Sequence, residues 1–337
     1  MSEKPVEWWE HLLNGGLALC NNYIYTGQTE RAAELLSQLE KTIPDHPMVR
    51  KLRSIDTSIP DLELIQFFGR HWKGEDLQGK SIEVFCDQGM GDIINMLRYL
   101  DEMKRKWPSS QIVLNCYAYY EKFSRLMEMI TYVDRFTDHH IPCDYHSNIF
   151  SVPIIMSGYT LDVPYPAHFH LLLEAGIPKK TLRISRKLRV GIAWQSNALN
   201  GQLAARKSMD LQDVLTLVDN RWELISLLPE KIGVAFLNES YVLNDLYDTA
   251  SLISTLDVVV SVDTVVLHLA GIMSKKSIGL LCTVADPRWG EIGDTQPWYS
   301  PGRLYRQKTL GDWSHPLHLV RDELEHLYNM MERESNG

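Results

Sequence analysis

The sequence contains little cysteine: its 337 residues include five, and no two of them form a Cys-x-x-Cys pair. An odd number without such pairs does not fit a disulfide framework, so we expect a reducing compartment. The first residues, MSEKPVEWWEHLLNGG, lack the apolar core of a signal peptide. No stretch is long and apolar enough to cross a bilayer. We therefore expect a cytoplasmic protein without a membrane span.

The sequence also lacks an excess of positive charge, because its formal net charge is -9. This charge disfavours a protein that coats nucleic acid through bulk attraction, although a local basic groove stays open. Hydrophobic residues make up 45% and charged residues 23%, as in ordinary globular proteins. The length is sufficient for two domains and a small additional module.

The N-terminal part has the spacing of one tetratricopeptide repeat. The positions that carry this spacing are Tyr23, Gly27, Ala32, Leu36, Leu39 and Pro44. A single repeat cannot bury its own apolar face, so it should pack on the rest of the protein. An ordinary helical hairpin is the alternative. In both cases we expect a helical module over residues 1–75.

From residue 80 onward, strand-like and helix-like segments alternate, which is typical of parallel sheets with crossover helices. The expected strands span 81–86, 111–117, 188–194, 222–228, 258–263 and 276–282. The expected helices span 92–107, 119–130, 210–218, 243–257, 264–273 and 316–334. A loop-rich stretch, 138–170, separates two such series. The fold class is therefore α/β, with domains at 76–180 and 181–313 and a final helix over 314–337.

The first strand is followed by Gly-Met-Gly-Asp at 89–92 and then by a helix. Glycines allow a tight turn and close approach of a ligand to the backbone, and a helix start attracts anions. A dinucleotide-binding fingerprint would need another glycine at 94, where the chain has Ile94. A dehydrogenase is therefore the least favoured class, and Asp92 needs another explanation.

A second polar corner follows the buried strand at 258–262. Asp263 can cap the next helix, Thr264 adds a hydroxyl, and His268 lies one helical turn later. Backbone donors, a hydroxyl and an imidazole together suit a diphosphate held at a helix N-terminus. A simple helix cap with a core histidine is the alternative.

Several stretches resemble the glycosyltransferases that are fused to tetratricopeptide repeats, which are relatives of the heptosyltransferases (glycosyltransferase family 9). They are SVDTVVLHLAG together with residues 286–313, DQGMGDIINMLRYL, RVGIAWQSN and DYHSNIFSVP. The stretches occur in the same order as in the family, and they cover about residues 70–320. The resemblance implies a GT-B fold, in which two Rossmann-like domains face a cleft. It also implies a nucleotide-diphosphate sugar donor, bound mostly by the second domain, and inversion at the anomeric carbon without a metal.

The resemblance implies roles for individual residues. Asp92 would be the catalytic base that takes the proton of the acceptor hydroxyl; a cap of the following helix is the alternative. The implied donor-binding residues are Asp263, Thr264, His268, Arg206, Lys207, Ser208, Gln195, Ser226 and Leu227. The implied residues on the acceptor or sugar side are Gln88, Gly89, Gly91, His146, Arg288 and Trp289.

Some of these assignments have structural alternatives. The AARKS segment could be a solvated loop, Trp289 a packing residue and His146 a surface histidine. The family's W-x-G-N-P loop reads WQSNALN in this chain, which puts the contacts of Gln195 in doubt. The segment HHIPCDYH superficially resembles zinc ligands, but its spacing fits no usual finger. We expect no metal and no cofactor besides the nucleotide sugar.

These observations predict a metal-independent, inverting glycosyltransferase that moves a hexosyl, pentosyl or heptosyl unit. A non-catalytic binding or scaffold protein and a nucleotide-sugar epimerase of the same architecture are the alternatives. The acceptor could be a protein, a glycan, a lipid-linked saccharide or a modified nucleobase, since a fold does not specify a substrate. A basic segment at 179–189 could meet a polyanion, although a solvated hinge is the simpler interpretation.

Overall fold

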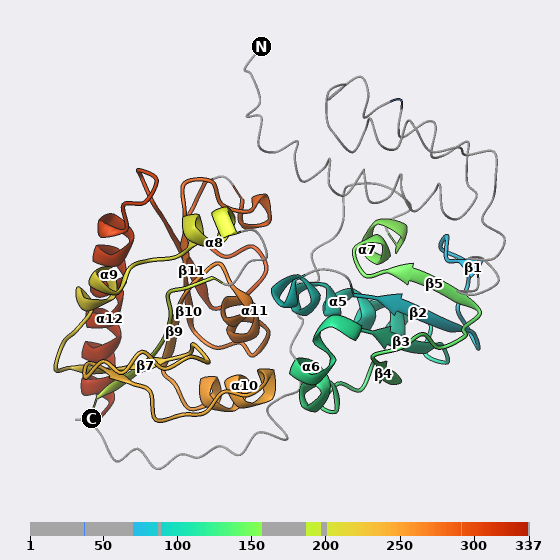
Figure 1. Ribbon diagram of the computed structural model, residues 1–337, viewed down its shortest axis with the longest axis horizontal. Helices are drawn as coiled ribbons and strands as arrows, with labels where there is room; N and C mark the ends of the chain where they lie inside the picture. Colours follow the sequence, from blue (N-terminus) through green and yellow to red (C-terminus); the bar gives the residue numbers. More distant parts are fainter. Residues whose placement is uncertain are drawn as a thin grey trace. The chain divides into compact units, whose positions relative to one another are not determined.

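The computed structural model describes residues 37, 70–86, 89–156, 187–196, 201–290 and 292–335. The chain divides into two compact units. The first contains residues 37, 70–86, 99–118 and 132–156, and the second contains 89–98, 119–131 and the described residues from 187 onward. Figure 1 labels most of the helices and strands of both.

The first unit is built on a five-stranded parallel sheet in the order β1-β5-β2-β3-β4. Its strands are β1 (Arg70–His71), β2 (Ser81–Phe85), β3 (Gln111–Asn115), β4 (Arg135–Thr137) and β5 (Tyr145–Asn148). Most residues of β2 and β3 are buried, as in strands that are covered on both faces. The chain continues from β2 to β3 on one side and returns to β5 on the other. The sheet therefore has a topological switch point between β2 and β5, where ligands bind in open α/β sheets.

The helices that follow these strands are α5 (Met90–Lys106), the 3₁₀ helix η1 (Tyr117–Tyr119), α6 (Tyr120–Met127) and α7 (Ser151–Met156). Helix α5 begins with Asp92 in its first turn and ends with Lys104, Arg105 and Lys106 in its last. This placement of charge complements the helix dipole, which favours anions at the start and cations at the end. The α5 residues up to Arg98, together with all of α6, belong to the second unit.

The second unit contains a six-stranded parallel sheet in the order β11-β10-β9-β6-β7-β8. Its strands are β6 (Leu188–Ala193), β7 (Trp222–Ser226), β8 (Leu237–Asn238), β9 (Val258–Val262), β10 (Ser277–Leu281) and β11 (Gly302–Arg306). Counted from β6, this is the 3-2-1-4-5-6 strand order of the Rossmann fold. Its switch point lies between β6 and β9.

Helices cover both faces of this sheet. They are α8 (Gly201–Lys207), α9 (Leu211–Leu215), α10 (Leu246–Ser254), α11 (Val265–Ile272), the 3₁₀ helix η3 (Pro287–Trp289) and α12 (Ser314–Ser335). On one face, Val260 of β9 shares a buried core with Leu317 and Val320 of α12. On the other, Leu267 of α11 packs against Gly279 of β10. Successive strand residues point to opposite faces, so the second unit is a doubly wound α/β structure.

The predicted strands and helices are confirmed where the structure describes them, with ends that differ by a few residues. The structure adds elements that the sequence did not indicate: β1, β4, β5, β8, β11, α7, α8, η1 and η3. The expectation of a loop-rich stretch over 138–170 is wrong for β5 and α7. Both elements are short, and β5 reads Tyr-His-Ser-Asn, without the apolar alternation that marks a strand.

The predicted helical module at 1–75 lies outside the described residues except at 37 and 70–75, and β1 occupies part of that short stretch. Most of the basic segment at 179–189 also lies outside them. The predicted domain bounds therefore stay a prediction. Within the described ranges, no helix has the length and apolar composition needed to cross a membrane.

Candidate active site

The carboxyl ends of β6 and β9 lie side by side, because Ala193 pairs with Ser261 in the parallel register. The chain leaves β6 through Trp194 and the exposed Gln195, and it leaves β9 through Asp263. This is the switch point of a Rossmann-ordered sheet, the place where such sheets bind nucleotides. The predicted donor residues of β6 and β9 therefore meet at one location within the second unit.

Helix α11 begins directly after β9, and Thr264 is its N-cap residue. The Thr264 hydroxyl accepts a hydrogen bond from the Val266 N–H at 3.3 Å and lies 3.2 Å from the Ser261 hydroxyl. The prediction that Asp263 caps this helix is therefore wrong. The first N–H groups of a helix have no partners within it, so the start of α11 offers donors to an anion.

Asp263 pairs instead with Lys207, the last residue of α8. Their Oδ2 and Nζ atoms are 2.5 Å apart, and the side chains are 8% and 15% exposed. Lys207 is thus held at the carboxyl end of the sheet, beside the start of α11. A cation in this position can neutralise phosphate. Arg206, the other predicted cation, is exposed.

Ser208 fastens the loop that follows β6. Its hydroxyl accepts a hydrogen bond from the Ser196 N–H at 3.0 Å and donates one to the Ala204 carbonyl at 2.7 Å. The Ser208 hydroxyl is therefore engaged by the backbone of Ser196 and Ala204, and it holds the loop that follows β6 in place. The same residue's carbonyl accepts a hydrogen bond from the Trp313 indole at 3.2 Å.

Asp92 lies in the first turn of α5, close to residues of the second unit's C-terminal part. Its Oδ1 is 2.5 Å from Nη1 of Arg288, and the two side chains are 25% and 18% exposed. Gly91 permits this approach, because a Cβ at residue 91 would lie 2.7 Å from Cδ2 of His268. The predicted base and three residues predicted for ligand contact therefore form one cluster.

Arg288 is held in place by Asp286. The Asp286 carboxylate accepts hydrogen bonds from the Arg288 backbone N–H at 3.0 Å and from its guanidinium at 2.9 Å. Burial alone would lower the pKa of Arg288, but the charges of Asp286 and Asp92 raise it above its usual value. The charge of Asp263 also raises the pKa of Arg288, to a smaller extent.

His268 is buried beneath this cluster. Its Nδ1 lies 2.7 Å from the Tyr299 hydroxyl, and its ring centroid is 5.1 Å from that of Trp289. Burial, followed by the charge of Arg288, lowers the pKa of His268 to about 3. The imidazole is therefore neutral at physiological pH, and it supplies no positive charge to a phosphate.

Trp289 is only 1% exposed and packs against the rings of His268 and Tyr299. A side chain this buried has almost no surface to offer a sugar, so the predicted contact of Trp289 on the acceptor or sugar side is wrong for this structure. Packing, the structural alternative, describes it.

Two of the predicted donor-binding residues, Ser226 and Leu227, lie at the end of β7 and just beyond it. Ser226 is buried, and its hydroxyl accepts a hydrogen bond from the Leu228 N–H at 3.3 Å. The Leu227 N–H extends the sheet by donating to the Ile192 carbonyl at 2.9 Å. The Leu227 N–H is thus engaged within the sheet, and the donor-binding role predicted for Ser226 and Leu227 stays a prediction.

In the first unit, His146 belongs to β5, beside the switch point of the first sheet. Its ring lies 6.2 Å from Phe85 and 5.4 Å from His71, measured between centroids. The prediction of an acceptor contact for His146 stays a prediction. Gln88 lies outside the described residues.

The histidine-rich segment that superficially resembled zinc ligands takes part in a buried polar cluster. Nδ1 of His140 is 2.5 Å from the fully buried Glu83 carboxylate, which also accepts a hydrogen bond from Asn115 at 2.8 Å. In the part of the chain that the structure describes, no group of three His, Cys, Asp or Glu residues could hold a metal ion.

Sequence reasoning missed the residues that support the site: Asp286, Tyr299, Asn95 and Arg98. Asp286 and Tyr299 lie within the stretch that carries the family resemblance, so their proximity to the motif was the available signal. Asn95 and Arg98 follow Asp92 on α5, where nothing in the sequence distinguishes them from core positions of an amphipathic helix.

No protein-family profile and no curated protein matches the chain. Among solved structures, it is similar to the glycosyl transferase family 9 protein of Veillonella parvula DSM 2008, with 11% identity and a TM-score of 0.45 over 70% of this chain and 88% of that one. It is also similar to the E. coli heptosyltransferase WaaC with ADP, with 12% identity and a TM-score of 0.49 over 73% and 99% of the two chains.

A third similar structure is the iron-containing dodecameric glycosyltransferase TibC from enterotoxigenic E. coli, with 10% identity and a TM-score of 0.49 over 77% of this chain and 78% of that one. All three are glycosyltransferases by description. At these identities and TM-scores, the similarities assign no activity to this chain.

Proposed function

We propose that this chain is an inverting, metal-independent glycosyltransferase that moves a sugar from a nucleoside-diphosphate sugar to an acceptor hydroxyl. The observation that carries the proposal is the cluster in the second unit. There, the turn that carries Asp92 lies against His268 of α11, whose start shares the switch point with the Lys207–Asp263 pair, and Asp92 pairs with Arg288. The ordered motifs of the sequence support the same class, and the GT-B arrangement is part of the proposal.

Each part of the cluster has a step to perform. The acceptor oxygen attacks the anomeric carbon while the Asp92 carboxylate takes its proton, and the bond from that carbon to the diphosphate oxygen breaks. The electron pair of the broken bond leaves with the nucleoside diphosphate. The negative charge on the leaving nucleoside diphosphate would be stabilised by Lys207, Arg288 and the first N–H groups of α11. Stabilisation of such developing charge is usually the largest single contribution to catalysis.

The pairing of Asp92 with Arg288 bears on this reaction. The guanidinium holds the carboxylate in one position, and a diphosphate that enters the site competes for the same cation. Donor binding would thereby release Asp92 to accept a proton from the acceptor. The order of binding that follows is donor first and acceptor second.

The proposal is tested by incubating the protein with UDP-, GDP-, ADP-, dTDP- and CDP-sugars, with and without a mixture of candidate acceptors that carry hydroxyl groups. The released nucleoside diphosphate is measured by chromatography. Asp92→Asn should lower kcat by about 10²–10⁴-fold, the usual share of a general base, and should not weaken donor binding, because it frees the Arg288 guanidinium for the diphosphate. Asp101→Asn is the matched control, because Asp101 lies on the same helix and outside the cluster. Its carboxylate pairs with Arg105 at a distance of 2.7 Å.

Equal turnover by the wild type and Asp92→Asn would overturn the role of Asp92. Binding of a nucleotide sugar without any turnover would favour the non-catalytic binding protein. A stereochemically altered nucleotide sugar, formed without acceptor, would favour the epimerase.

A further inference from the structure

Three buried polar side chains form a hydrogen-bonded chain in the second unit. Asn95 Nδ2 donates to the Tyr299 hydroxyl at 3.0 Å, and that hydroxyl lies 2.7 Å from Nδ1 of His268. None of the three is exposed, and they come from α5, the segment before β11, and α11. Buried polar groups that are linked in this way fix one another's hydrogen positions.

The donors can be assigned from the chemistry of the groups. A tyrosine hydroxyl has one hydrogen to donate, and the Asn95 NH₂ group can only donate. The Arg98 guanidinium lies 5.1 Å from the centre of the Tyr299 ring. It also has only donors, so it cannot accept the hydrogen of the Tyr299 hydroxyl. The hydroxyl therefore accepts from the Asn95 side and donates its hydrogen to Nδ1 of His268.

A neutral imidazole carries one hydrogen, on either Nδ1 or Nε2. Since Nδ1 accepts from Tyr299, the hydrogen is on Nε2. The ring stays neutral because burial and the charges of Arg288 and Arg98 outweigh the opposing attraction of Asp263 and Asp286.

The Nε2 edge of the ring faces the turn that precedes Asp92. A Cβ on Gly91 would lie 3.4 Å from Nε2, in addition to its contact with Cδ2 at 2.7 Å. The lack of a side chain at this position leaves the backbone of the glycine turn beside the imidazole N–H.

We propose that Asn95 and Tyr299 are positioning residues that hold His268 as the neutral Nε2–H tautomer, which offers an uncharged N–H donor to an oxygen atom of the ligand at the glycine turn. The inference rests on the proposed function and deepens it. Lys207 and Arg288 neutralise the negative charge of the diphosphate. His268 adds a hydrogen bond in one direction, and this bond is kept because Tyr299 and Asn95 fix the tautomer.

The test is a ¹⁵N NMR measurement of the histidine ring nitrogens in the ligand-free, full-length protein at pH 7, with the His268 signals identified by their loss in His268→Gln. The expected spectrum shows a pyridine-type Nδ1 and a pyrrole-type Nε2. In Tyr299→Phe, which removes only the hydroxyl, this preference should disappear. Tyr305→Phe is the matched control, since Tyr305 lies on β11 outside the chain of hydrogen bonds.

A pyrrole-type Nδ1, an imidazolium, or an unchanged tautomer in Tyr299→Phe would overturn the inference. Tyr299→Phe should also lower kcat for sugar transfer by roughly tenfold, since the His268 N–H is kept but its tautomer is no longer fixed. KM for the nucleotide sugar should change less. The NMR result needs no nucleotide, so a failure of nucleotide binding would count against the proposed function and not against the tautomer.

Discussion

At the scale of single residues, the candidate site depends on a close approach that only glycine permits. Gly91 has no side chain where a Cβ would lie 2.7 Å from the His268 ring. His268 cannot move away, because Tyr299 and Trp289 enclose it. The turn that carries Asp92 therefore fits against α11 as a rigid contact.

We predict that Gly91→Ala destabilises the protein by about 1–3 kcal/mol, as overpacking of a buried contact does, and lowers activity more strongly because it displaces Asp92. Urea denaturation measures the first effect. The control is Gly91→Ala combined with His268→Ala, which removes the ring that the new methyl group would meet. The combined cost should be smaller than the sum of the separate costs, and strict additivity would contradict the contact.

Two buried histidines give the stability a pH dependence. Burial, followed by the charge of His146, lowers the pKa of His71 to about 3, and the pKa of His268 is also lowered to about 3, mainly by burial. Between the two pKa values of each residue, about 3 when folded and about 6.5 when unfolded, the unfolded chain binds a proton that the folded chain does not. The free energy of unfolding therefore falls as the pH drops below about 6.5.

We predict that His71→Gln reduces this slope between pH 7 and pH 5, where each such histidine contributes up to about 1.4 kcal/mol per pH unit. Urea denaturation at a series of pH values gives the slope. His318→Gln should leave it unchanged, because that side chain is 70% exposed. An identical slope in His71→Gln and the wild type would show that His71 does not stay neutral in the folded protein.

The strand ends and family motifs predict Asp92, Thr264, Lys207 and His268 as site residues, and all four lie in the second unit. Their roles stay predictions. Sequence reasoning misjudged Trp289, because a tryptophan in the polar segment DPRWG looks exposed when only its neighbours in the chain are considered. Its burial comes from His268 and Tyr299. Such packing is non-local, and residue spacing does not report it.

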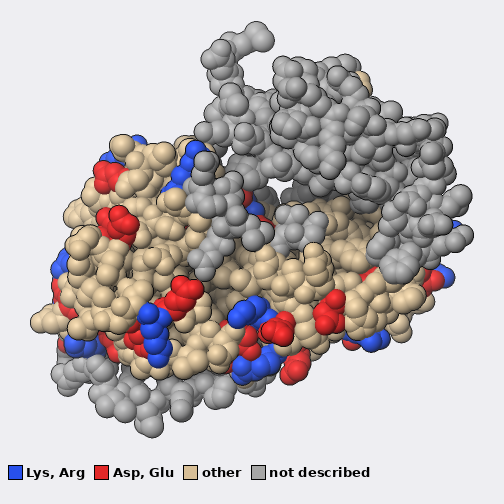
Figure 2. Space-filling model, in the orientation of Figure 1, with Lys and Arg blue, Asp and Glu red and all other residues tan. Residues whose placement is uncertain are grey.

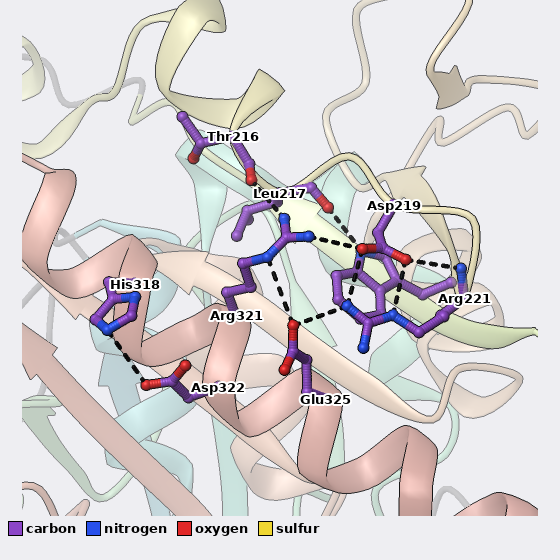
Figure 3. A network of polar contacts seen from close by, with 9 residues as sticks. Thr216, Leu217, Asp219, Arg221, His318, Arg321, Asp322 and Glu325 are labelled. Atoms are coloured by element: carbon purple, nitrogen blue, oxygen red, sulfur yellow. Dashed lines mark hydrogen bonds and ion pairs between the residues drawn. The ribbon is translucent and has the colours of Figure 1, made fainter.

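At the scale of elements, an ion-pair network fastens α12 to the segment between α9 and β7 (Figure 3). Asp219 accepts hydrogen bonds from Arg221 at 2.9 Å and from Arg321 at 2.6 Å, and Arg221 reaches Glu325 at 2.7 Å. The two guanidinium groups also lie over the Trp222 ring, at 4.9 and 5.6 Å from its centroid. The hydrogen bond from Arg221 is the main cause that lowers the pKa of Asp219.

We predict that Arg321→Ala lowers the free energy of unfolding by about 1 kcal/mol, the upper part of the range for partly exposed pairs, because it loses ion pairs and a contact with Trp222 together. The difference from wild type should shrink in high salt, which screens charge. His318→Ala on the same helix should have little effect, since its ion pair with Asp322 is long and exposed. A cost that does not depend on salt would assign the stabilisation to packing alone.

The strands that could be predicted are those with continuous apolar residues, such as β9 and β10, which are wholly buried. The strands that were missed are short or polar. In β5, only Ser147 is fully buried, and the strand is held by backbone pairing with β1 and β2. Pairing of this kind depends on residues distant in the chain, so local pattern does not reveal it.

At the scale of the whole molecule, each unit is a parallel α/β structure, and the strand order of the second is that of the Rossmann fold. The predicted class is confirmed at this level. Strand order could not be predicted from the sequence, since alternation of strands and helices is compatible with several parallel topologies. It is the strand order that places the topological switch point between β6 and β9.

On the described part of the face that Figure 2 shows, positive and negative side chains are mixed. This mixture is in keeping with a formal net charge of -9. A nucleotide would be recognised by the few cations placed at the strand ends. In the proposed nucleotide site, Lys207, paired with Asp263, is the cation at the β6–β9 switch point.

The most direct test of this claim is a thermal-denaturation panel with UDP, GDP, ADP, dTDP and CDP in the absence of metal. A ligand at about 100 times its Kd should add roughly 2.7 kcal/mol to stability, so one nucleotide should raise the Tm of the wild type. Lys207→Met combined with Asp263→Asn should abolish that increase without leaving a buried charge unpaired. Lys276→Met with Glu323→Gln is the matched control and should retain the increase, because it removes the 2.9 Å ion pair between Lys276, just before β10, and Glu323 of α12. No shift with any nucleotide, or an equal shift in the Lys207 double variant, would contradict a nucleotide site at the β6–β9 switch point.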